Sequence, residues 1–143
     1  MSSLFDQSQT LERAEILVEA ATKAGADAAD AIAARSASTS VSYREGKMEE
    51  NEHSENDSIA LRVFVDGCKA SISTNGTGDK EELAKLAERA VAMAKLSPPD
   101  PYARLAAVED LMTSGAIEEL REKLDLVDDF MPDHAFLRQL AQE

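Results

Sequence analysis

The 143-residue sequence has no tryptophan, a single cysteine and only 4% aromatic residues. Without many large rings, its core must be built mainly from Ala, Leu, Val and Ile, and an apolar content of 43% suffices for one domain. The lone Cys68 cannot form an internal disulfide. We interpret it as a small strand residue, because the alternative, a reactive thiol, would need a neighbouring base.

Long apolar runs and an excess of positive charge are missing as well. No stretch reaches the length of a transmembrane helix, and residues 1–9 lack the basic start and apolar centre of a signal peptide. We therefore expect a cytoplasmic chain, in a reducing compartment and with no membrane partner. The 15 basic and 28 acidic residues give a net charge of −13. Such a field repels nucleic-acid phosphates, so the composition argues against direct nucleic-acid binding.

The motifs of familiar catalytic sites are absent too. The sequence contains no HExxH, HExxxH, CxxC or GxSxG, and no phosphate-binding GxxxxGK[ST] or GxGxxG. Its two histidines, His53 and His134, stand far apart in the chain, and we interpret each as a surface residue. The serines within residues 36–42 are interpreted as the polar face of a strand. The residues thus predict no catalytic, cofactor-binding or metal-binding group in this chain.

What the sequence does contain is a β-rich centre, residues 38–74. Between residues 59 and 66 every second side chain is a large aliphatic one, which is the two-residue period of a strand. Asp66-Gly67 favours a type I′ hairpin turn, which needs positive φ angles, and Glu45-Gly46 is a weaker signal of the same kind. We predict strands at 38–44, 59–66 and 68–74, another between the first two, and one at 27–36 centred on Ile32.

Two helices flank this centre in the sequence. The first is predicted over residues 9–24, where apolar residues recur every three to four positions. The second begins near residue 79 and stops before two prolines, which cannot continue a helix. The predicted fold class is therefore α+β: an antiparallel sheet of about four to five strands with two helices packed on one face, plus a short helical C-terminal tail. Ser8 or Thr10 is expected to cap the start of the first helix, and Gly25 is expected to end it. A capping box of Asp79 and Glu82 is expected at the start of the second helix.

An acidic stretch, residues 47–57, lies between the two predicted turns. One interpretation is a solvated edge strand followed by a loop. The other is a cation site, because hard cations take carboxylate ligands, although the spacing fits no calcium loop and the glycine of such a loop is missing. The carboxylates of this second interpretation are Glu49, Glu50, Glu52, Glu55 and Asp57.

Three parts of the chain can be distinguished: a flexible stretch at 1–9, a domain at 10–105 and a helical tail at 106–143. The stiff sequence SPPDPY marks the second boundary. The tail has too few large apolar groups to fold alone, so we expect it to dock on the domain, pair with another chain or stay partly mobile. Pro132 can occupy the first turn of its last helix. The apolar residues of the tail are Ile117, Leu120, Leu124 and Val127, followed by Phe136, Leu137 and Leu140.

Several short motifs follow one another over residues 10–105. They are a helix ending in GAD, a small-residue strand, a G-x-x-E hairpin at Gly46 and Glu49, a run from Ser58 to Val65 continued from Gly67 to Ser71, and SPPDP from Ser97 to Pro101. In this order they resemble the N-terminal domain of the TldD/PmbA family, and within it the PmbA (TldE) branch.

The resemblance implies a proteolytic system. In this family a TldD-like subunit carries zinc on an HExxxH motif, a PmbA-like subunit lacks that motif, and the two assemble to cleave unfolded peptides. The family has also been described as modulating DNA gyrase. The larger C-terminal domain that holds the zinc motif is not in this sequence, so we expect a fragment or a shortened form. The resemblance implies no cofactor in this chain, zinc in a TldD-like partner and an extended peptide as substrate. A homodimer is a further option for this chain.

We weigh three functions. The first is a noncatalytic N-terminal domain of a PmbA/TldE-like subunit in a TldD-type zinc metalloprotease complex, where it helps to form the peptide channel. The alternative is a stand-alone protein–protein interaction module, and the third, an independent enzyme, is disfavoured because no nucleophile or metal set emerged. The expected functional surface is a sheet edge together with the apolar tail, with the acidic segment 49–57 as a solubilising guard.

Overall fold

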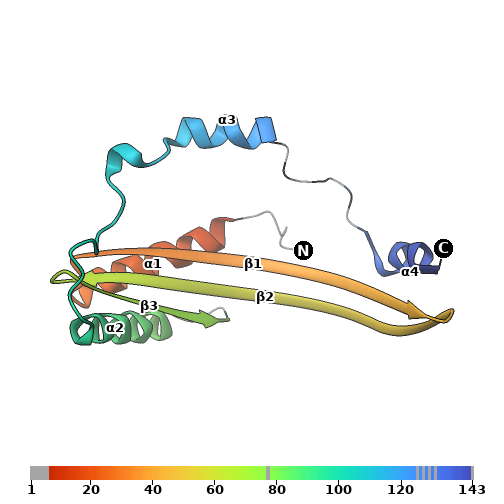
Figure 1. The fold of residues 1–143 in the computed structure, drawn as a ribbon, viewed down its shortest axis with the longest axis horizontal. Coiled ribbons are helices and arrows are strands. Elements are labelled where there is room, and N and C mark those ends of the chain that lie inside the picture. Colours follow the sequence, from red (N-terminus) through yellow and green to blue (C-terminus); the bar gives the residue numbers. More distant parts are fainter. Residues whose placement is uncertain are drawn as a thin grey trace. The chain divides into compact units, whose positions relative to one another are not determined.

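The computed structural model describes residues 7–76, 78–124, 126, 128, 130 and 132–142. Its contacts divide the chain into two compact units, Met1–Ala37 with Glu55–Leu105 (unit 1) and Ser38–Ser54 with Ala106–Glu143 (unit 2). The elements in chain order, drawn in Figure 1, are α1 (Ser8–Lys23), β1 (Ala28–Arg44), β2 (Lys47–Val65), β3 (Cys68–Asn75), α2 (Lys80–Leu96), the 3₁₀ helix η1 (Val108–Asp110), α3 (Ser114–Leu124) and α4 (His134–Gln142).

Among the described residues the sheet has three strands in the order β1-β2-β3, so the four to five strands predicted are not confirmed. The strands expected at 27–36 and 38–44 form one strand, β1. The acidic stretch 47–57, expected as an edge strand and loop, is the first part of β2. Neither β1 nor β2 contains a glycine or proline, so no residue weakens or interrupts the ladder, and neighbouring predicted strands merge.

Both hairpin turns have the predicted geometry. Glu45 and Gly46 have φ angles of 52° and 74°, and Asp66 and Gly67 have 49° and 75°. Positive φ at both central residues defines a type I′ turn, whose twist matches that of the flanking strands. Beyond the second turn, β2 and β3 pair antiparallel along the whole of β3.

The core of unit 1 lies between one face of the sheet and the two helices α1 and α2. The odd-numbered residues of β2 from Ile59 to Val65 are buried on this face, and Ile72 of β3 packs beside them opposite Leu61. Burying one large aliphatic side chain contributes about 1.5–3 kcal/mol. The helices add alanines and larger aliphatic residues to this cluster: Leu17 and Ala21 from α1, and Leu83, Leu86, Ala87, Ala90, Val91 and Ala94 from α2.

The two ends of α1 were predicted with different success. Its N-cap is Gln7, which has a helical conformation and no side-chain hydrogen bond, so the predicted caps Ser8 and Thr10 are wrong. Its C-terminal end follows the prediction, because Gly25 has φ 101° and the N–H of Ala26 reaches back five residues to a helix carbonyl. This pattern is a Schellman motif, which satisfies carbonyls that the helix leaves free.

The capping box of α2 is confirmed. The Asp79 carboxylate accepts the N–H of Glu82 at 2.9 Å, and the Glu82 carboxylate accepts the N–H of Asp79 at 3.2 Å. The helix ends at Leu96, and Ser97 is already extended. The proline that follows disfavours a helical conformation at this position.

The SPPDPY segment is fixed to the β2–β3 turn. The N–H of Asp100 donates to the carbonyl of Gly67 at 2.9 Å, and Lys69 Nζ donates to the Asp100 carboxylate at 2.7 Å. The Lys69 hydrogen bond, and after it the N–H of Tyr102, lower the pKa of Asp100. The predicted boundary is therefore a segment with defined contacts in unit 1.

The tail helices of unit 2 begin at capped residues. Asp133 accepts the N–H of Phe136 at 2.7 Å, so Pro132 precedes α4 rather than lying in its first turn as predicted. Thr113 Oγ1 accepts an N–H at the start of α3 at 3.3 Å. The predicted apolar residue Val127 lies outside the described residues, as do residues 1–6 of the predicted flexible start. None of the helices in the described ranges is long and apolar enough to cross a membrane.

Candidate functional site

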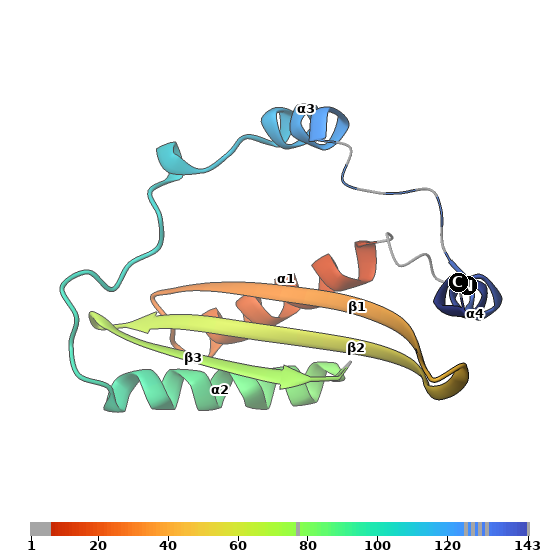
Figure 2. The same cartoon turned by 45° about the vertical axis from the view of Figure 1, so that its right-hand side comes forward.

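β1 and β2 are much longer than β3, as Figures 1 and 2 show. β3 pairs with β2 only from Ser58 to Val65. Residues 47–54 of β2 therefore have β1 on one side and an open edge on the other, and all eight side chains are exposed. We name Ser38–Ser54 the hairpin arm. Its open edge presents backbone N–H and C=O groups that another strand can pair with.

Carboxylates lie on both faces of β2 in the arm, because successive side chains point to opposite faces. Glu49 is paired with Arg44 at 3.6 Å, and both side chains are more than half exposed. Glu50 and Glu52 share the other face, and neither forms an ion pair with a described residue. The arm thus carries more acidic than basic residues, and the carboxylates of Glu50 and Glu52 form no ion pair with a described residue on their face.

Asp57, the last of the candidate cation ligands, belongs to a structural ion pair in unit 1. Its carboxylate accepts Arg35 Nε at 3.0 Å and Arg35 Nη2 at 3.3 Å. The Arg35 hydrogen bond lowers the pKa of Asp57, burial opposes this shift, and the charge of Arg13 reinforces it. The two side chains are 19% and 26% exposed, so this pair fixes β1 to β2 in a partly desolvated place.

The proposed cation site is therefore not assembled. Its residues alternate between faces of an extended strand, and the first and last of them already pair with arginines. Across the described ranges, no group of three or more His, Cys, Asp or Glu side chains could hold a metal ion. The side chains in these ranges therefore do not supply the ligand set of a metallopeptidase zinc centre either.

The structure brings the two histidines together within unit 2, although the sequence suggested two separate surface residues. The rings of His53 and His134 are 6.3 Å apart between centroids and inclined by 63°. Thr39 Oγ1 lies 2.9 Å from His53 Nδ1, and Gln142 Nε2 donates to Tyr43 Oη at 3.0 Å. These contacts place α4 on the hairpin arm. No periodicity in the sequence could have revealed them, because the partners are far apart along the chain.

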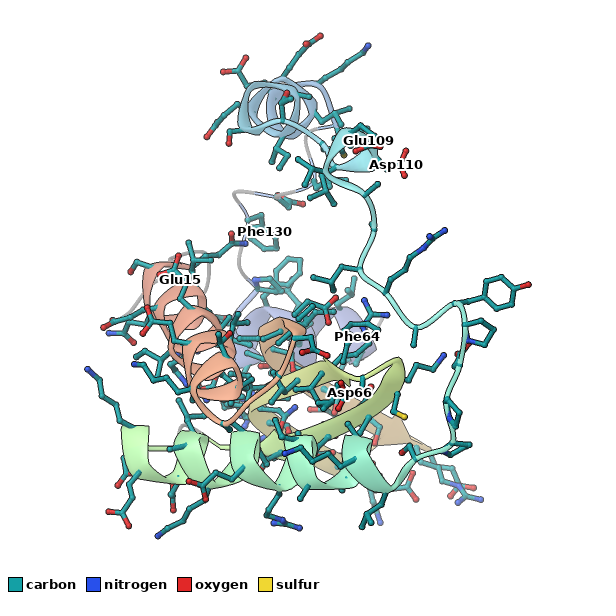
Figure 3. All side chains as sticks on the ribbon, turned by 90° about the vertical axis from the view of Figure 1, so that its left-hand side faces the viewer. Glu15, Phe64, Asp66, Glu109, Asp110 and Phe130 are labelled. Carbon is teal, nitrogen blue, oxygen red and sulfur yellow. The ribbon has the colours of Figure 1, made fainter. Side chains whose placement is uncertain are left out.

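The face of the sheet opposite α1 and α2 carries a polar cluster in unit 1. Arg62 forms a bidentate ion pair with Asp30, and its guanidinium lies 5.4 Å from the ring centre of Phe64. Phe64, labelled in Figure 3, is 5% exposed. Ile32 of β1 is 73% exposed. This face therefore carries a guanidinium whose position is fixed by a carboxylate and an aromatic ring.

The remaining candidates have structural surroundings. Cys68 is half-buried, and its thiol donates weakly to the carbonyl of Asp66 at 3.9 Å, which supplies no base. Ser36, Ser38 and Ser40 are exposed along β1, as predicted for a polar strand face. A shallow groove of about 340 Å³ between α1 and α2 is lined by Ile16, Glu19, Ala20, Lys23, Ala24, Lys80, Ala84 and Glu88.

These observations define a class of protein: a small α+β domain with helices on one face of an antiparallel sheet and an exposed, acidic hairpin arm. Comparisons with known proteins refine this description. Residues 29–94 match the sequence model of "PmbA/TldA metallopeptidase domain 1". The matched model belongs to the family that the order of the motifs resembles.

The fold also resembles a crystal structure from Bacteroides thetaiotaomicron, of a protein described as a proposed modulator of DNA gyrase. The TM-score is 0.69 at 24% identity, over 76% of this chain and 24% of that one. This likeness establishes a shared fold, and the present chain spans about a quarter of the length of that protein. A comparison with curated proteins finds no significant match.

Proposed function

We propose that this chain is a noncatalytic N-terminal domain of a PmbA/TldE-like subunit in a TldD-type zinc metalloprotease complex. The observation that supports this most is the match of residues 29–94 to a metallopeptidase first domain. The described residues offer no metal-ligand group, so zinc would reside in a TldD-like partner subunit. The complex would act in the cytoplasm.

In this role the domain would help to form the channel for an extended peptide. The open edges of the sheet suit it, because main-chain hydrogen bonds to an edge strand bind a peptide largely independently of its sequence. The net charge of −13 disfavours contact with DNA. Any action on DNA gyrase, the target in the description of the similar structure, would therefore run through protein contacts.

Reconstitution with a TldD-like subunit tests this function. We expect the two chains to elute together in size-exclusion chromatography, and the mixture to cleave an unfolded peptide until a chelator removes the zinc. The isolated chain should show no cleavage with or without chelator. Chelator-sensitive cleavage by the isolated chain would contradict a noncatalytic role.

The alternative is a stand-alone protein–protein interaction module. It is favoured by α4, whose apolar side chains Phe136 and Leu140 are 44% and 59% exposed. Exposed apolar groups gathered on one helix often mark a contact surface. Homodimers in light scattering, without affinity for a TldD-like subunit, would support this alternative.

A further inference from the structure

The open edge of β2 in the hairpin arm can accept one more strand. Residues 47–54 lie beyond the end of β3, which stops opposite Ser58, and no described strand pairs with this side of them. Eight residues of strand span about 26 Å. A two-stranded ribbon is marginally stable in water, so a third strand at this edge would stabilise the arm.

The charge of the edge determines which strand fits. A strand added beside β2 places every second side chain on the face of Glu50 and Glu52, with opposed Cβ atoms about 5 Å apart. Both glutamates are exposed and form no ion pair in the described part of the chain. Lysine or arginine side chains opposite them would form favourable cross-strand pairs, and acidic side chains would be repelled.

A second copy of this chain is a poor occupant of the same edge. Its own arm carries the same carboxylates, and each copy has a net charge of −13. Like charges directly opposite each other destabilise a strand pair. The edge therefore discriminates against self-pairing and in favour of basic strands.

We propose that residues 47–54 form a β-augmentation site for an unfolded, basic peptide. The peptide adds as a strand beside β2 and places Lys or Arg side chains at alternate positions, facing Glu50 and Glu52. The inference rests on the proposed function, because it names the class of peptide that the channel receives. Backbone pairing provides the register, and the two carboxylates provide the selectivity.

Fluorescence anisotropy with the full chain tests this site. The probe is a labelled eight-residue peptide that alternates Lys with Thr, and the first control replaces each Lys by Glu. Two further peptides carry N-methyl groups on every second residue, one peptide on the odd-numbered and the other on the even-numbered residues. In a strand, alternate backbone N–H groups point to the same side, so only one of the two peptides loses the N–H donors that face β2. We expect the Lys peptide to bind at low salt, the Glu peptide not to bind, and one methylated peptide to lose about tenfold or more in affinity.

Matched variants of the chain locate the site. Glu50→Gln with Glu52→Gln should weaken binding of the Lys peptide about threefold to tenfold. Glu118→Gln with Glu122→Gln removes the same charge from α3 and should change the affinity for the Lys peptide less than about twofold. Far-ultraviolet circular dichroism should confirm that both variants are folded. Absence of Lys-peptide binding, equal losses in both variants, or full binding by both methylated peptides would overturn the proposal.

The assay also separates this proposal from the function on which it rests. It uses the chain alone, so a negative result leaves co-elution with a TldD-like subunit unaffected. Conversely, if the chain binds the basic peptide but not a TldD-like subunit, the β-augmentation site is supported and the proposed complex is contradicted.

Discussion

Two residues with positive φ close the turn between β2 and β3, and Gly67 is the more demanding of them. A Cβ built at Gly67 would meet no atom within 4 Å, so the constraint comes from its φ of 75° and not from crowding. Gly67→Val should lower the free energy of unfolding by about 1–3 kcal/mol, because a β-branched residue is strained in this region. Gly67→Asn should cost much less. Equal urea midpoints for the Val variant and the parent would contradict the type I′ assignment.

The ion pair of Asp57 and Arg35 makes stability depend on pH. Because Arg35 lowers the pKa of Asp57 below 3.8 in the folded chain, the pair stabilises the fold above that pH, and the gain is lost as the pH falls through the lower, folded-state value. Asp57→Asn should therefore lower the free energy of unfolding at neutral pH. In strong acid the variant and the parent should converge.

Urea unfolding at neutral pH and near pH 2 measures this difference. Asp110→Asn is the control, because Asp110 is exposed on the 3₁₀ helix η1 and should change stability little at either pH. A destabilisation by Asp57→Asn that persists unchanged in acid would show that its charge is not the cause.

Among the elements, α2 is stabilised by the capping box at its N-terminus. Asp79→Ala removes a carboxylate that accepts the N–H of Glu82, and it should destabilise the chain by about 1 kcal/mol. Asp79→Ser keeps a capping oxygen and should recover most of this loss. Thermal unfolding compares the three proteins, and an Asp79→Ala variant that melts like the parent would show that packing alone fixes the helix.

The hairpin arm leaves one edge of β2 available for unwanted pairing. Its carboxylates should act as a guard, because charges along an open strand edge discourage association with other copies. Replacing Glu49, Glu50 and Glu52 together by Ser should raise self-association, measured by light scattering at fixed concentration. A triple variant as monodisperse as the parent would show that these carboxylates do not limit self-association.

At the scale of the whole molecule, the described part of the tail exposes several large apolar side chains. Leu120 and Leu124 of α3 are 36% and 54% exposed. Leu120→Glu with Leu124→Glu should leave the domain at 10–105 folded, with an unchanged melting temperature, and should abolish dimerisation or partner binding. Variants that associate like the parent would exclude α3 as a contact surface.

Local sequence determined much of this protein. The positive-φ turns at Asp66-Gly67 and Glu45-Gly46, the capping box of α2 and the Gly25 end of α1 depend on residues close together in the chain. The alternation from Ile59 onward likewise identified the buried face of β2. The ordered motifs resemble the same family whose model matches residues 29–94, since they are local patterns in a fixed order.

Tertiary structure decided the rest, because it depends on pairs of residues that are distant in the chain. Five predicted strand segments became three strands once each long strand had a neighbour to pair with along the ladder. Asp57 was removed from a candidate cation site by Arg35, a residue of another strand. His53 and His134 met because α4 lies on the hairpin arm. No local propensity encodes such contacts, since their free energy arises only when the chain has brought both partners together.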